Sequence, residues 1–132
     1  MWHRSPWGRI SGVSTAADPS KHRLLLLRHG QTVSNLKGIW QGQLDNELTD
    51  LGREQARAAA AAIASLRPTR VVSSDLVRAR DTAEEVAAAS GGLSVALDER
   101  WREIHAGGWQ GLTAAQVAAR YPEDAERLVS GE

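Results

Sequence analysis

The feature that most constrains the fold is a run of four leucines, Leu24 to Leu27, that ends in Arg28, His29 and Gly30. A run this short between polar residues favours a strand buried on both faces, as in a parallel sheet covered by helices. Ligands of open α/β sheets bind at the carboxyl ends of the strands, where these last three residues fall. Gly30 lets a ligand approach the backbone, Arg28 offers a fork of N–H donors, and His29 offers a ring nitrogen that can attack when neutral. The stretch therefore suits a phosphate, although a histidine in such a place is more often a packed or hydrogen-bonding residue.

Length and charge narrow the classes of protein that remain. The 132 residues suffice for about one domain, and 16 Lys and Arg residues balance 16 Asp and Glu residues. Zero formal charge provides no general attraction to nucleic acid or to an acidic membrane, so neither is expected as a partner and any anion site must be local. The lack of cysteine excludes disulfides and thiolate nucleophiles.

Targeting signals are not evident in the sequence. No run approaches the roughly 20 apolar residues of a membrane span, and the first residues lack the apolar core of a secretory signal. A cytoplasmic location is the expectation. Residues 1–21 carry scattered Pro, Gly, Ser and Thr without periodicity and are predicted to be a flexible leader, followed by one domain over residues 22–132.

Helices and strands are predicted to alternate along this domain. The first helix is expected from its N-cap Thr49 to just before Pro68, and the second from the N-cap candidates Ser73, Ser74 and Asp75 to about Ser90. Their inward-facing stripes are predicted as Ala59, Ala62, Ile63 and Leu66, and as Ala79, Ala83, Val86 and Ala87. Strands are expected at 71–72 and 93–97, with loops over 31–47 and 98–111. A capping box at Thr113 and Gln116 opens a last helix that Pro122 interrupts, and one or two further turns follow from Glu123. The pattern predicts an α/β fold: a doubly wound, mostly parallel sheet with helices on both faces.

Several polar residues near the ends of the predicted strands could bind an anion. Asn35 and Gln41 could donate from the long first loop and Trp40 could form a wall, although a solvated loop explains these residues equally well. Arg78 and Arg80 fall at the start of a helix, where backbone N–H groups already favour anions. The alternative for either arginine is a surface ion pair with Asp81, Glu84 or Glu85.

Three motifs in order carry a resemblance to a known family. They are Leu27 to Thr32 with Asn35; Ser73 to Ala79 with Thr82 and Ala83; and Glu103 followed by Gly108 to Thr113. Over about residues 23–117 the sequence resembles the histidine phosphatase superfamily, the phosphoglycerate mutase-like proteins. The resemblance makes His29 the nucleophile, Arg28 and Arg78 its electrostatic clamp, and Glu103 the general acid, with Asn35 a further phosphate donor. It also places Gly30, Gln41 and Gly42 in the substrate site, requires no metal or other cofactor, and leaves His105 an ordinary loop residue.

The loop from Gln41 to Leu48 refines this resemblance. It is similar to the small phosphatase branch, especially to glucosyl-3-phosphoglycerate phosphatases. The expected function is therefore that of a metal-independent phosphomonoesterase, acting through a phosphohistidine on a small phosphorylated metabolite such as glucosyl-3-phosphoglycerate or another sugar or glycerate phosphate. Phosphoryl transfer of the phosphoglycerate mutase type, a non-catalytic phosphate-binding module and a truncated product remain alternatives.

The sequence departs from the family at its C-terminal end. Family members usually continue to a further strand that ends in a second histidine followed by glycine, whereas this sequence stops at Glu132. The chain is therefore expected to be a C-terminally truncated form of the domain. An unpaired edge on the leucine strand would then offer a template for association, so a homodimer is a further expectation.

Overall fold

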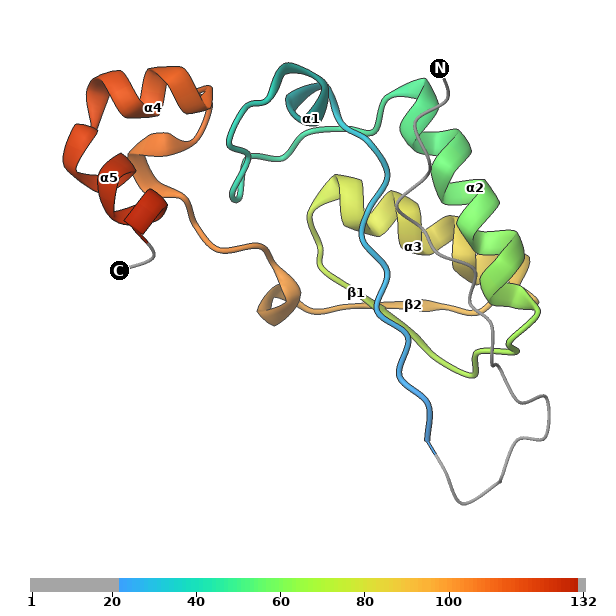
Figure 1. Ribbon diagram of the computed structural model, residues 1–132. Helices are drawn as coiled ribbons and strands as arrows, with labels where there is room; N and C mark the ends of the chain where they lie inside the picture. Colours follow the sequence, from blue (N-terminus) through green and yellow to red (C-terminus); the bar gives the residue numbers. More distant parts are fainter. Residues whose placement is uncertain (1–21, 131–132) are drawn as a thin grey trace.

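The computed structural model describes residues 22–130, so the predicted leader over residues 1–21 lies outside the described residues (Figure 1). The described elements are α1 (Val33–Lys37), α2 (Asp50–Ala64), β1 (Val71–Ser73), α3 (Val77–Ala89), β2 (Val95–Leu97), the short 3₁₀ turns η1 (Glu99–Trp101) and η2 (Gly107–Trp109), α4 (Ala114–Arg120) and α5 (Pro122–Ser130).

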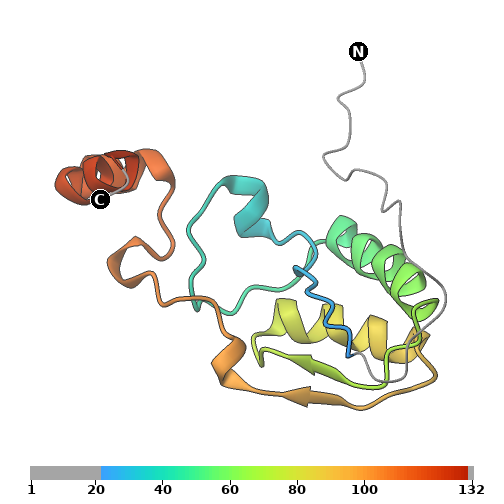
Figure 2. The same cartoon turned by 60° about the horizontal axis from the view of Figure 1, so that its bottom comes forward.

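A parallel βαβ unit forms the centre of the fold. β1 and β2 pair in parallel with Val71 opposite Val95 and Ser73 opposite Leu97, and α3 makes the crossover between them. Parallel neighbours need such a crossover because their ends lie at opposite edges of the sheet. α2 packs along α3, and both helices lie on the same side of the two strands in Figure 2. The expected mixed α/β fold with a parallel sheet and helices is confirmed, while the helices expected on both faces of the sheet stay a prediction, because α2 and α3 share one side.

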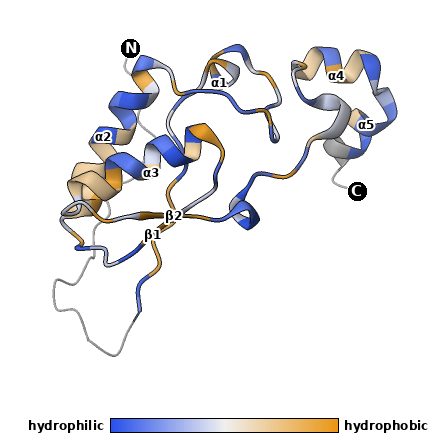
Figure 3. Cartoon of the chain, turned by 180° about the vertical axis from the view of Figure 1, so that it is seen from behind, coloured by the Kyte–Doolittle hydropathy of each residue, from blue (hydrophilic) through white to orange (hydrophobic). Residues whose placement is uncertain are grey.

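Small residues bring α2 close to α3. Ala56 and Ala60 are only 1% and 2% exposed, and the C-terminal half of α2 is its apolar half (Figure 3). The core consists of Ala60, Val71, Val86 and Ala87, with Ile63, Ala83, Leu93 and Val95 packed around them. The stripe predicted for α2 is confirmed only in part: Ile63 packs against the core, but Ala62 is exposed and the buried residues are Gly52, Ala56 and Ala60. A run of alanines looks alike on every face of a helix, so hydropathy alone could not fix which face is buried.

Several local predictions are confirmed by the structure. Thr49 caps α2 by accepting from the Gly52 N–H at 3.0 Å, and that helix ends before Pro68. Thr113 and Gln116 form the predicted capping box of α4. These signals act within one helical turn, so they can be read from the sequence.

The leucine run does not form the predicted buried strand. Residues 24–27 are extended but unpaired, and their exposure lies between 45% and 78%. Among the described residues β1 and β2 pair only with each other, so the leucines gain neither ladder hydrogen bonds nor a covered face. An apolar strand signal is realised only where a partner edge receives it.

Three boundaries also differ from expectation. The predicted loop over 31–47 contains α1, which Thr32 and Asn35 open with a reciprocal capping box. The N-cap position of α3 is Leu76, not one of the residues 73–75, because the carboxylate of Asp45 accepts from the Val77 N–H at 2.7 Å. α5 begins at Pro122 itself and extends to Ser130, since proline suits the first turn of a helix, where its missing N–H costs nothing.

Candidate active site

The imidazole of His29 is half-buried and held at both ring nitrogens. Nδ1 lies 2.7 Å from the Gly30 carbonyl oxygen, and Nε2 lies 3.2 Å from Arg78 Nε. A carbonyl can only accept and a guanidinium can only donate, so these partners select the neutral tautomer with its proton on Nδ1. Burial lowers the pKa of His29; the Gly30 carbonyl opposes this effect, and the charges of Arg78 and Arg28 reinforce it. The ring therefore carries an unprotonated Nε2 near neutral pH.

Arg78 is the most buried charged residue of the site, at 3% exposure. It lies in the first turn of α3 and donates from Nη1 to the Leu44 carbonyl and from Nη2 to the Gly42 carbonyl, both at 2.7 Å. With the bond to His29, three of its five N–H groups are used, which leaves one on each terminal nitrogen for a ligand. Its neighbour Arg80 instead forms the surface ion pairs that were the alternative for both arginines.

Gly42 has a structural reason to be glycine. Its φ of 50° is left-handed, and a Cβ there would lie 2.8 Å from the Ala106 backbone nitrogen. This turn aims the Gly42 carbonyl at Arg78. Gly42 thus contributes to the site through the guanidinium that its backbone anchors.

Gly30 is required by a crossing of two backbones. A Cβ on Gly30 would overlap the carbonyl oxygen of Gly52, and a Cβ on Gly52 would overlap the carbonyl oxygen of Gln31. The Gly30 N–H donates to Thr82 Oγ1 at 3.2 Å, and the Thr82 hydroxyl donates to the Arg78 carbonyl at 2.8 Å. The sequence suggested that Gly30 admits a ligand, but its bare α-carbon faces α2. Thr82, which no sequence argument had singled out for a role, connects the two halves of the site.

The amide oxygens of Asn35 and Gln41 are both directed at Thr32. Asn35 Oδ1 accepts from the Thr32 N–H at 3.0 Å, and Gln41 Oε1 lies 2.8 Å from the fully buried Thr32 hydroxyl. Only their NH₂ groups are left to donate to an anion. Their predicted role as phosphate donors stays a prediction.

Glu103 reaches the cluster from the segment after β2. Burial lowers the pKa of both His29 and Arg78, and the exposed Glu103 carboxylate opposes this effect at each of them. Arg28 is also exposed, and its charge lowers the pKa of His29. The structure thus brings His29 and Arg78 into direct contact, whereas Glu103 and Arg28 act on His29 through their charges; the catalytic roles of all four stay predictions.

Aromatic and backbone contacts join the two loops around the cluster. Trp40 and Trp109 pack edge to face with their centroids 5.2 Å apart, and the Trp40 backbone exchanges hydrogen bonds with Gly111 and Leu112 at 2.9 Å. His105 is exposed and accepts from the Gly107 N–H through Nδ1, as expected of a loop residue.

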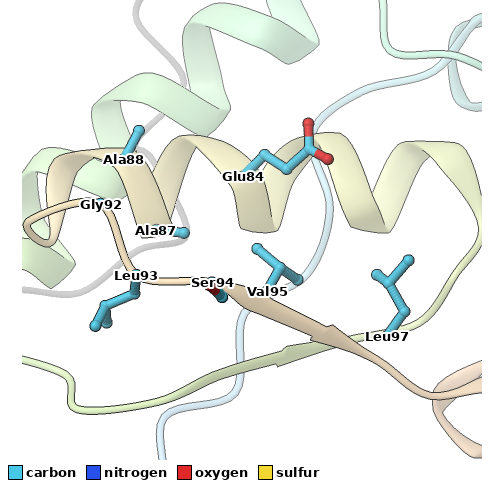
Figure 4. A pocket seen from close by; sticks show the side chains of 8 residues that line it. All are labelled: Glu84, Ala87, Ala88, Gly92, Leu93, Ser94, Val95 and Leu97. Atoms are coloured by element: carbon cyan, nitrogen blue, oxygen red, sulfur yellow. The ribbon is translucent and has the colours of Figure 1, made fainter.

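A hollow lies elsewhere, between α3 and β2, and Figure 4 shows Glu84, Val95 and Leu97 among its lining residues. None of the predicted site residues lines it.

Over residues 22–130, no group of three or more His, Cys, Asp or Glu side chains is placed to hold a metal ion. None of the helices described is both long and apolar enough to cross a membrane.

A neutral histidine that is hydrogen-bonded by a buried arginine, next to a parallel βαβ unit, is an arrangement suited to an anion beside an imidazole. The chain belongs to the histidine phosphatase superfamily (branch 1), which matches residues 24–132.

Similar proteins include phosphatases of small metabolites. Glucosyl-3-phosphoglycerate phosphatase of Mycobacterium tuberculosis is 53% identical over 100 residues, which cover 76% of this chain and 44% of the relative. Phosphoserine phosphatase 1 of Hydrogenobacter thermophilus is 36% identical, covering 81% and 50%. The solved structure of the mycobacterial glucosyl-3-phosphoglycerate phosphatase in complex with VO3 superimposes with a TM-score of 0.71 at 50% identity, covering 76% of this chain and 47% of that one. The chain spans about half the length of the curated relatives it matches.

Proposed function

We propose that the protein is a metal-independent phosphomonoesterase that acts through a phosphohistidine at His29. The observation that carries this proposal is the pairing of His29 Nε2 with Arg78 Nε at 3.2 Å. It presents an unprotonated ring nitrogen next to a buried guanidinium. A nucleophile and a matching positive charge are what phosphoryl transfer needs, because positioning and electrostatics supply most of its catalysis.

In the first step the lone pair of His29 Nε2 forms a bond to phosphorus while the ester P–O bond breaks. Arg78 Nε must cease donating to Nε2 as that bond forms, and its free terminal N–H groups and Arg28 then face the phosphoryl oxygens. Glu103, after taking up a proton from solvent, gives that proton to the departing oxygen, which leaves as an alcohol.

In the second step the carboxylate of Glu103 accepts a proton from water. The water oxygen bonds to phosphorus and the N–P bond breaks, so phosphate leaves and His29 regains its lone pair. Two easier displacements thereby replace one difficult hydrolysis.

The substrate class follows from the relatives. Phosphatases named for glucosyl-3-phosphoglycerate and for phosphoserine are 53% and 36% identical to this chain. We propose a small alkyl phosphate that carries a carboxylate, with glucosyl-3-phosphoglycerate the first substrate to test.

A phosphohistidine trap tests the proposal. The protein is mixed briefly with glucosyl-3-phosphoglycerate, quenched in alkali and digested for mass spectrometry. One acid-labile phosphoryl group should appear on His29 and should vanish in His29→Asn, while His105→Asn serves as the matched control and keeps it. An acid-stable adduct on serine or threonine would refute the mechanism.

The same experiment separates the alternatives. Transfer of the trapped group to an added glycerate, rather than to water, would indicate mutase-type chemistry. Binding of phosphate without any adduct would indicate a non-catalytic module. A homodimer stays a prediction, supported by the exposed and unpaired backbone of residues 24–27.

A further inference from the structure

One ion pair bridges the two segments that carry Arg78 and Glu103. Asp75 lies in the turn between β1 and α3, shortly before Arg78, and Arg102 directly precedes Glu103. The two partners are 27 positions apart in sequence. The Asp75–Arg102 ion pair therefore joins the segment that carries Arg78 to the segment that carries Glu103.

The geometry of this bridge is that of a two-pronged fork. Arg102 Nε donates to Asp75 Oδ1 at 2.7 Å, and Arg102 Nη2 donates to the second oxygen, Oδ2. Both side chains are about one-third exposed. The hydrogen bond from Arg102 lowers the pKa of Asp75, so the carboxylate stays ionised at neutral pH. Two parallel bonds between planar groups fix orientation as well as distance.

Glu103 has few other anchors. Its carboxylate accepts from the adjacent Ile104 N–H at 2.9 Å, and its carbonyl oxygen accepts from Gln43 Nε2 at 3.1 Å. The last bond to β1, from the Asp98 N–H to the Ser73 carbonyl, is separated from Glu103 by the turn η1. The acid therefore sits on a segment that has left the sheet and needs a separate tether.

We propose that Asp75 and Arg102 are positioning residues that hold the Glu103 segment in register with Arg78 and His29. This inference rests on the proposed function of Glu103 as the general acid. A displacement of about 1 Å in a catalytic group is enough to lower a rate by roughly 10²-fold.

The role predicts a dependence on the leaving group. A misplaced acid slows the departure of an alcohol, which must be protonated, much more than the departure of nitrophenolate, which needs little protonation. Binding of the phosphoryl group depends on the arginines and should be spared.

The test compares Asp75→Asn, Arg102→Gln and the double variant with Arg100→Gln as control. Arg100 makes a similar fork to Asp98, but both partners lie in one local segment. We expect Arg102→Gln and Asp75→Asn to lower kcat on glucosyl-3-phosphoglycerate by about 10-fold, part of the roughly 10²–10⁴-fold that general acid catalysis supplies. Turnover of p-nitrophenyl phosphate and both KM values should change by less than about 2-fold, and the double variant should be no worse than either single variant. Arg100→Gln should match the wild type.

A second readout does not depend on turnover. The ¹⁵N order parameters of the Glu103 and Ile104 amides should fall from about 0.85 toward 0.6 in Arg102→Gln and Asp75→Asn, but not in Arg100→Gln. Unchanged order parameters, equal losses on both substrates or an equal loss in Arg100→Gln would each overturn the positioning role. Turnover that survives the His29→Asn substitution would overturn the proposed function instead, while the order parameters would still decide whether Asp75 and Arg102 hold the Glu103 segment.

Discussion

Replacing Arg78 by alanine should both destabilise the fold and disable the site, and the structure gives the size of each effect. The side chain is 3% exposed, and two of its bonds anchor the Gly42 and Leu44 carbonyls. A buried acceptor left without its donor costs about 1–3 kcal/mol. Because Leu44 is only half-buried and water can reach it, we expect a total loss of about 2–4 kcal/mol in the free energy of unfolding. In a domain of this size that lowers Tm by roughly 10–30 °C.

Thermal unfolding followed by circular dichroism measures the loss, and Arg80→Ala is the matched control. Arg80 lies on the same helix, but its ion pairs with Asp81 and Glu84 are half-exposed and should contribute no more than about 1 kcal/mol. At a temperature where both variants are folded, kcat/KM should fall by about 10²–10³-fold in Arg78→Ala only. If the two variants melt within a few degrees of each other, Arg78 does not hold the loop, and the reasoning from its carbonyl bonds is wrong.

Three further predictions concern pH, capping and the core. Burial lowers the pKa of His29 below 6.5, so kcat/KM should stay level down to about that pH and fall only in more acidic buffer. For the same reason the free energy of unfolding should decrease as the pH drops below 6.5, because the unfolded chain then binds a proton that the folded His29 ring does not. A pH profile of either quantity with its midpoint above 6.5 would contradict the lowered pKa of His29. Asp45→Ala should destabilise α3 by about 1 kcal/mol in urea unfolding, since it removes the acceptor for the Val77 N–H, and an unchanged midpoint would show that water replaces it. Val86→Ala should cost about 2 kcal/mol in the core, whereas the 40%-exposed Val72→Ala should cost well under half as much.

Features that act within one turn of the chain could be predicted from the sequence. Thr49 and Thr113 were identified as caps, and both strands of the parallel pair were placed, because capping boxes and short apolar runs are local signals. The three separate motifs also predict His29, Arg78 and Glu103 as site residues, because each motif can be read within a few neighbouring positions.

Features that depend on a distant partner could not be predicted in this way. Asp45 caps a helix that begins 32 positions later, and nothing in the spacing reveals that acceptor. The Gly42 and Leu44 carbonyls that hold Arg78 are backbone groups, which every sequence possesses. The buried strand predicted over residues 24–27 was wrong for a related reason. A strand forms only where a neighbouring strand offers an edge to pair with, and the sequence shows the apolar side chains but not that neighbour.

The contact between Gly30 and Gly52 has a mechanical consequence for His29. With no side chain at either α-carbon, the backbone that follows His29 rests directly on the first turn of α2. Side chains can absorb small displacements by changing rotamer, but a junction of two backbones has no such compliance. A change in the tilt of α2 should therefore move the imidazole of His29 by a similar amount. The direction in which the ring points then depends on the orientation of the whole helix.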